Sequence, residues 1–338
     1  MSEYSDLLWH YIMKEKRADV AEIAGHCGVN TKDIFEYIKG RNLPASDEMV
    51  QNICDFIHLT PAETERLKEM YRMAKMGRRT YRQYKKLEDL IASVSAFEKK
   101  GHAPPPLYEA GREARDRKEG CLVLENERDL NKAISQELLW ESRKENGHIG
   151  LVTALPLHFP IQFLTARAEV FSRTCLEQIF YFHAPGQDEA DMEERLDCLR
   201  EILPFYEEDM DYHSYYRYGD PDSRFYNLNL LPCLILTSES AVLFDPDRSH
   251  GLAFWESSVA SMLRLQFEEY KSACRPLIHR EEKAEPSGEK NDLFYMKHTS
   301  GDAPGSLILR VAEQTLRLEE PGICAMFRGY LDSGGRKG

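Results

Sequence analysis

Residues 18–44 read ADVAEIAGHCGVNTKDIFEYIKGRNLP, and this stretch predicts a short helix, a tight turn and a second helix. Asp19 can cap the first helix, because its carboxylate accepts hydrogen bonds from backbone N–H groups that have no partner inside the helix. Gly28 supplies the turn, and Asn30 or Thr31 caps the second helix. Gly40 closes that helix, and Pro44 prevents its continuation. The inward faces carry apolar residues at helical spacing: Val20, Ile23, Ala24, Ile34, Tyr37 and Ile38.

The residues Ile23-Ala24, Gly28-Val29, Ile34 and Gly40, followed by Pro44, resemble the helix-turn-helix of the lambda-repressor-like (XRE-type) DNA-binding domains. The resemblance covers roughly residues 4–76 and implies a five-helix domain of a transcriptional regulator that binds double-stranded DNA. It implies that the outward residues of the second helix meet base edges in a major groove, namely Thr31, Lys32, Asp33 and Glu36. It leaves Lys39 and Arg41 available for phosphates.

The charge of this segment keeps a second interpretation open. Residues 1–76 contain ten Lys and Arg against thirteen Asp and Glu, a net charge of −3. Phosphate neutralisation supplies most non-specific DNA affinity, so a single acidic head should bind weakly and a homodimer is expected. The alternative is an interaction protein whose helical module binds a protein partner.

Residues 78–100 predict a helix whose two ends differ in character. The first part is basic, and Arg78 and Arg79 could touch phosphates beside the reading helix, although a solvated helix face explains them as well. Tyr84, Leu87, Ile91 and Val94 follow at a spacing that suits either a short coiled-coil seam or packing back onto a domain. The segment His102 to Pro106 then marks a domain boundary.

Length and composition predict a multi-domain cytoplasmic protein. The 338 residues are 42% hydrophobic and 30% charged, with a net charge of −13. No membrane span or signal peptide is expected, because no long uncharged apolar run occurs and charges interrupt the first apolar stretch. The eight cysteines are scattered without a CxxC pair, which is typical of reduced thiols.

Four segments are expected in chain order. Residues 1–76 form the helix-turn-helix domain, residues 77–106 a helical linker, and residues 107–280 an α/β domain for sensing or assembly. Residues 281–338 add short strands and a final helix. Apolar strands alternate with amphipathic helices after residue 107, which predicts a mixed, mostly parallel sheet. The run LLPCLILTSESAVLFDPD predicts a hairpin around Ser238 to Ser240.

The α/β part shows no catalytic signature. GxGxxG, GxxxxGK[ST], HExxH and GxSxG are all missing, so no enzyme and no cofactor are expected. An enzyme in which the α/β domain acts on a small molecule is the third hypothesis, and a cleft with converging titratable groups would support it. The alternation with its closing hairpin faintly resembles the phospholipase-D-like domains that some bacterial regulators use as sensors. The HxK signature of that family is absent, so the resemblance implies a sensor without activity.

Residues 205–226 hold the best candidate for ligand binding. Aromatic rings alternate with acidic residues there, and tyrosines beside carboxylates can bind a cation or stack on a base or sugar. The candidate ligand-binding residues are Tyr212, His213, Tyr215, Tyr216 and Tyr218. Packing of the rings onto the sheet is the alternative. His148, His158, His183, His213 and Asp245 could approach one another at strand ends, but isolated histidines usually serve structure, so no metal site is expected.

The hypothesis from the sequence is therefore a dimeric DNA-binding regulator. Its head reads DNA, and a small-molecule effector bound near the aromatic stretch changes the spacing of the two reading helices.

Overall fold

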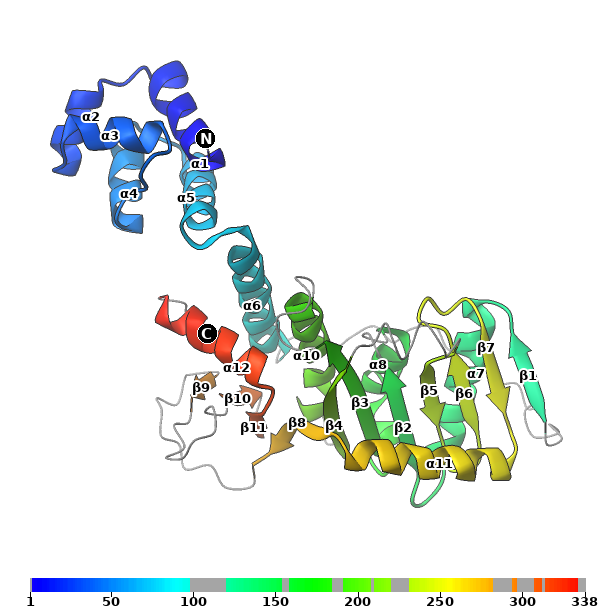
Figure 1. Ribbon diagram of the computed structural model, residues 1–338. Helices are drawn as coiled ribbons and strands as arrows, with labels where there is room; N and C mark the ends of the chain where they lie inside the picture. The colour runs from blue at the N-terminus through cyan, green and yellow to red at the C-terminus, as the bar shows by residue number, and fades with distance from the viewer. Residues whose placement is uncertain are drawn as a thin grey trace. The chain divides into compact units, whose positions relative to one another are not determined.

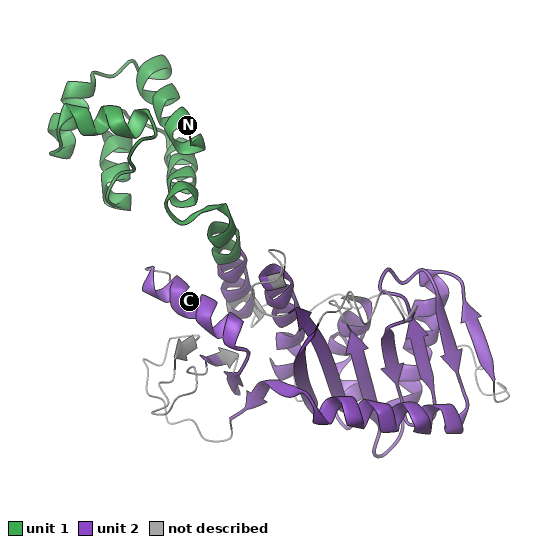
Figure 2. Ribbon diagram, in the orientation of Figure 1, with its two compact units in different colours: residues 1–85 green, residues 86–338 purple. Residues whose placement is uncertain are grey.

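The computed structural model describes residues 2–97, 120–153, 158–183, 191–207, 210–219, 231–281, 294–296, 307–311 and 314–333. The chain divides into two compact units, residues 1–85 (the first unit) and residues 86–338 (the second unit), as Figure 2 shows. The sequence-based boundaries at residues 76, 106 and 280 stay predictions. No helix in the described ranges is long and apolar enough to cross a membrane.

The first unit is helical, as predicted. Its elements are α1 (Glu3–Trp9), a π-helical continuation (His10–Glu15), α2 (Val20–Cys27), α3 (Thr31–Ile38), α4 (Asp47–Phe56), α5 (Pro61–Met76) and the start of α6 (Arg78–Phe97). Their apolar faces share one core, in which Leu8, Ile23, Ile34, Ile53 and Leu67 are fully buried. Each such side chain contributes roughly 1.5–3 kcal/mol by leaving water.

Local sequence explains where these helices begin and end. Thr60 and Glu63 form a capping box at the start of α5, because the Glu63 carboxylate accepts from the Thr60 N–H at 2.7 Å. The hydroxyl of Tyr71 donates to the carbonyl of Pro44 at 2.8 Å. This buried hydrogen bond attaches the segment after α3 to α5.

The second unit contains a sheet flanked by helices (Figure 1). Its strands are β1 (Cys121–Leu124), β2 (His148–Thr153), β3 (Cys175–His183), β4 (Tyr212–Gly219), β5 (Cys233–Leu236), β6 (Ala241–Phe244), β7 (Gly251–Phe254), β8 (Arg275–Arg280), β9 (Phe294–Met296), β10 (Leu307–Val311) and β11 (Gln314–Leu318). Its helices after α6 are α7 (Glu127–Glu141), α8 (His158–Thr165), α9 (Ala168–Phe171), α10 (Asp191–Glu207), α11 (Ser257–Ser272) and α12 (Pro321–Asp332).

The strand order is β1-β7-β6-β5-β2-β3-β4-β8-β11-β10-β9. Only β2–β3 and β3–β4 are parallel among these described strands, and every other neighbouring pair is antiparallel. The mixed sheet was predicted, but the prediction of a mostly parallel sheet is wrong. Helices connect β1 to β2, β2 to β3, β3 to β4 and β7 to β8, but only β2–β3 and β3–β4 of these pairs are neighbours in the sheet. Strands β5 to β7 follow one another as antiparallel neighbours. The predicted hairpin around Ser238 is the β5–β6 pair.

The two faces of the sheet are covered differently. Helix α11 packs on one face, where Phe267 and Ala260 join Val152 and Ile179 in a buried cluster. Gly150 makes room for this helix, because a β-carbon there would lie 3.1 Å from the Phe267 ring. On the opposite face, α8 contacts both α7 and α10 (Figure 1).

A buried ion pair connects α10 to α12 within the second unit. The Arg195 guanidinium donates from Nη1 to Glu320 Oε1 at 2.8 Å, and both side chains are 0% exposed. Glu320 also accepts from the Ile323 N–H at the start of α12 and from the Tyr218 hydroxyl. The guanidinium lies over the rings of Phe182 and Tyr218, 5.4 and 5.3 Å from their centroids. The pair thereby joins β3, β4, α10 and α12 in one packed unit.

Candidate nucleic-acid interface

Helix α3 and the turn before it are built by local hydrogen bonds. Asp19 caps α2 by accepting from the Ala21 N–H at 2.7 Å. Gly28 ends α2 in the left-handed conformation, with φ of +68°. Asn30, rather than Thr31, is the residue before α3, and its N–H donates to Asp33 Oδ2 at 3.1 Å. The carboxylate of Asp33 therefore holds the start of α3 together.

The outward face of α3 is a continuous polar and aromatic surface. Thr31, Lys32, Phe35 and Lys39 are all exposed, while Ile34, Tyr37 and Ile38 face the core. Successive residues of a helix are turned by about 100°, so the four exposed residues share one side. Thr31, Lys32, Phe35 and Lys39 are named here the α3 face.

Phe35 is a member of this face that the sequence interpretation missed. Its ring is 40% exposed, and Lys39 Nζ lies 5.9 Å from the ring centroid. An exposed ring can contact a thymine methyl group, as apolar side chains do in the major groove. The signal was present in the spacing, because position 35 lies between positions 31 and 39 on the same side of the helix.

The remaining predicted DNA-binding residues have other partners. Arg41 Nη1 lies 3.3 Å from Glu36 Oε1, so these two side chains partly neutralise each other at the end of α3. Arg78 forms an ion pair with Glu3 of α1, and Arg79 is exposed at the start of α6. The structure thus brings Thr31, Lys32 and Lys39 together and attaches Arg78 to a different helix.

In the aromatic stretch, Tyr212 to Gly219 form an interior strand of the sheet. Strand β4 lies between β3 and β8, so its side chains alternate between the two faces of the sheet. Tyr212 and Tyr216 are buried, and Tyr212 donates to Gln178 Oε1 at 2.9 Å. Tyr218 on the same side donates to Glu320.

His213 and Tyr215 project from the other face of β4, the face that α11 covers. The hydroxyl of Tyr215 donates to Glu177 at 3.4 Å, and His213 pairs with Asp211. The five predicted ligand-binding residues are therefore divided between two faces and do not form one cage. Ligand binding by these residues stays a prediction.

Glu177 is the centre of a polar cluster beneath α11. His148 Nε2 donates to Glu177 at 2.9 Å, and Lys271 Nζ lies 2.9 Å from both of its carboxylate oxygens. Arg264 donates to the other ring nitrogen of His148. Burial alone would raise the pKa of Glu177, but the hydrogen bonds from His148 and Lys271 outweigh it and lower the pKa from 4.5 to about 2.

Comparisons with known proteins add a distant likeness. No protein-family model matches the chain, and no curated protein matches it. Among solved structures, the chain is similar to TrmBL2, described as an archaeal chromatin protein with a novel mode of DNA binding. The TM-score is 0.32 and the sequence identity 13%, over 81% of this chain and 94% of that chain. A likeness at this level carries no inference about family or function, so the case for DNA binding depends on the α3 face.

Proposed function

We propose that the chain is a sequence-specific transcriptional regulator in which the α3 face enters a major groove of double-stranded DNA. The observation that carries this proposal is the exposure of Thr31, Lys32, Phe35 and Lys39 along one side of a helix. A major groove about 12 Å wide admits an α-helix. The side chains that face it could bind a base edge, a phosphate and a thymine methyl group.

The helix-turn-helix domain should bind DNA as a dimer. Its acidic net charge weakens attraction to phosphates, so one copy gains little non-specific affinity. Two copies would place their α3 faces in successive major grooves about 34 Å apart, and the site would be a pseudo-palindrome. The spacing between half-sites, measured in DNA sequences selected from a random pool by the chain, tests this arrangement. Selected sequences with a single unrepeated site would argue against the dimer.

The test removes two positive charges from the α3 face. We expect Lys32→Ala with Lys39→Ala to weaken DNA binding about 10- to 100-fold, because Lys32 would contact a base edge and Lys39 a phosphate. The slope of log K against log[salt] should fall by about 1, since one phosphate contact is lost. Fluorescence anisotropy of the full chain measures both quantities, with duplexes selected from a random pool.

A matched control separates recognition from overall charge. Lys14→Ala with Lys75→Ala removes the same charge from exposed lysines outside α3 and should leave affinity nearly unchanged. Equal losses in both variants would contradict the role of α3. Absence of salt-dependent DNA binding by the unmodified chain would favour the alternative, in which the acidic helical module binds a protein partner.

We also propose that the second unit senses a small apolar effector. A mostly apolar pocket of about 170 Å³, partly open to solvent at Gln266 and Tyr270, lies between α11 and the sheet. Val152, Leu234, Leu263 and Phe267 are among the residues that line it. A pocket of this volume is large enough for a molecule such as benzene. The cavity lies on the face opposite Tyr212 and Tyr216.

Benzene is the probe for this cavity. At ten times its Kd it should stabilise the second unit by about 1.4 kcal/mol. Leu263→Trp, which fills the cavity, should abolish the effect in thermal unfolding, and Leu265→Trp on the exposed side of α11 should retain it. Benzene stabilisation that survives Leu263→Trp would exclude this cavity as the site.

A further inference from the structure

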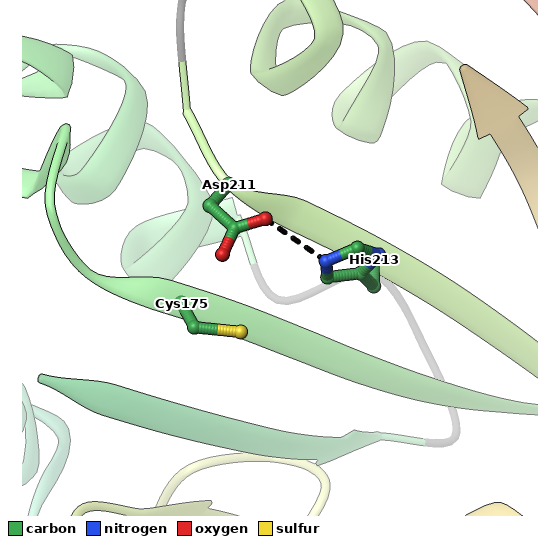
Figure 3. Close-up of side chains that lie close together, drawn as sticks. All are labelled: Cys175, Asp211 and His213. Atoms are coloured by element: carbon green, nitrogen blue, oxygen red, sulfur yellow. Dashed lines mark hydrogen bonds and ion pairs between the residues drawn. The ribbon is translucent and has the colours of Figure 1, made fainter. Parts of the chain in front are cut away.

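Cys175, Asp211 and His213 lie together at one edge of the sheet (Figure 3). Cys175 is the first residue of β3, Asp211 immediately precedes β4, and His213 is the second residue of β4. Because β3 and β4 are parallel, with Leu176 opposite Tyr212, the two strand beginnings meet at the same edge. The pleat turns all three side chains to one face.

The three side chains lie close enough together to share one ion. One ligand atom from each, the thiol sulfur, a carboxylate oxygen and an imidazole nitrogen, all lie within 4.8 Å of one another. His213 Nε2 and Asp211 Oδ1 are 2.9 Å apart. Ligands around a tetrahedral zinc ion are about 3.3–3.7 Å apart, so the three side chains would have to rotate slightly to surround an ion.

The backbone fixes the positions from which these side chains project. The Cys175 N–H donates to the Gly147 carbonyl at 2.9 Å, and the Leu176 N–H donates to the Asp211 carbonyl at 2.8 Å. Solvent reaches the cluster, because the side chains of Asp211 and His213 are 59% and 51% exposed. The ligand set is therefore held by the sheet and open to an ion.

We propose that Cys175, Asp211 and His213 bind one zinc-type divalent ion, with a fourth position open to water. Thiolate, imidazole and carboxylate together suit Zn²⁺, whereas Mg²⁺ and Ca²⁺ prefer oxygen ligands. On binding, the Cys175 S–H bond breaks and an S–metal bond forms, the thiol proton passes to solvent, and the ring nitrogen of His213 that faces the ion donates its lone pair. This site departs from the sequence-based expectation of no metal.

A second group of potential metal ligands differs from this one because a lysine already lies among its carboxylates. His148, Glu177 and Glu268 also lie within 4.8 Å of one another. There Lys271 Nζ lies 2.9 Å from Glu177 and 2.6 Å from Glu268, so an ammonium group already holds the position of a cation. Among the described residues, no lysine or arginine nitrogen lies within 4 Å of the Asp211 carboxylate, and His213 is its ion-pair partner.

The experiment titrates the full chain, freed of metal with a chelator, with Co²⁺ and then Zn²⁺. We expect one equivalent of Co²⁺ to produce a thiolate-to-cobalt charge-transfer absorption, which Zn²⁺ then removes. Cys175→Ser should abolish the absorption, and His213→Ala should weaken binding about 10- to 100-fold. The His213 side chain is exposed, so its replacement should leave circular dichroism unchanged even if Cys175→Ser impairs folding.

Two matched controls use groups that lack the full ligand set. Cys121→Ser removes an exposed thiol elsewhere, and His250→Ala removes an exposed histidine that pairs with Asp245. Both should bind Co²⁺ as the unmodified chain does. Absence of stoichiometric binding, or an absorption that persists in Cys175→Ser and His213→Ala alike, would overturn the proposal.

Discussion

Replacement of Glu320 by alanine is expected to lower the free energy of unfolding of the second unit by about 3–5 kcal/mol. The change removes the carboxylate that the buried Arg195 guanidinium contacts at 2.8 Å. It also removes the acceptor for the Ile323 N–H at the start of α12. Taking one partner from a buried ion pair costs more than the pair itself contributes, because the remaining charge keeps its desolvation cost.

Tryptophan fluorescence during urea unfolding can report on the second unit alone. The chain has three tryptophans, and a Trp9→Phe background leaves Trp140 and Trp255, both in the second unit. Arg195→Met with Glu320→Gln should cost less than Glu320→Ala, since it removes both charges and keeps an acceptor for α12. Glu127→Ala removes the partner of Arg248 in a more exposed pair and should cost at most about 1 kcal/mol. A loss for Glu320→Ala no larger than for Glu127→Ala would contradict the prediction.

Glu177→Gln is expected to remove about 3 kcal/mol from the stability of the second unit at pH 7, and nothing near pH 2. The pKa of Glu177 is lowered to about 2 in the folded chain, so its ionised form stabilises the fold above its ordinary pKa of 4.5. That stabilisation is complete above about pH 5.5 and is lost as the pH falls from 4.5 through 2. The unmodified chain should therefore lose stability across this interval, and the variant should lose less.

Tryptophan fluorescence in the same background measures this dependence at a series of pH values. Glu269→Gln, on the exposed side of α11, is the matched control and should follow the unmodified chain. If Glu177→Gln ran parallel to the unmodified chain between pH 5 and pH 2, other groups would account for the acid sensitivity.

The features that the sequence predicted correctly are those that short segments specify. Asp19, Gly28 and Thr60 act within one helical turn of their own positions, so the helix ends in the first unit could be read residue by residue. The β5–β6 hairpin was equally accessible, because Ser238 to Ser240 separate two apolar runs. The exposure of Lys32 and Lys39 followed from the periodicity of α3.

The features that were missed depend on partners far along the chain. Whether the outer strands run parallel or antiparallel depends on pairings such as β8 with β11. The residues within each strand do not indicate which strand will be its neighbour. Tyr212 to Tyr218 alternate as a strand does, but the sequence interpretation considered only a ligand site and rings packed onto the sheet, and not a strand within it. Cys175 and His213 meet only through the register of β3 and β4, which the sequence does not reveal.

The position of β1 has a consequence for biosynthesis. The strand pairs with β7, and all of β2 to β6 lies between the two along the chain. A ribosome therefore releases β1 long before its partner exists, and closing so long a loop is entropically costly. Leu122 and Val123, which are 44% and 61% exposed even after pairing, spend that interval in contact with solvent. We therefore expect this edge of the nascent chain to be open to aggregation until the β5–β7 meander has emerged.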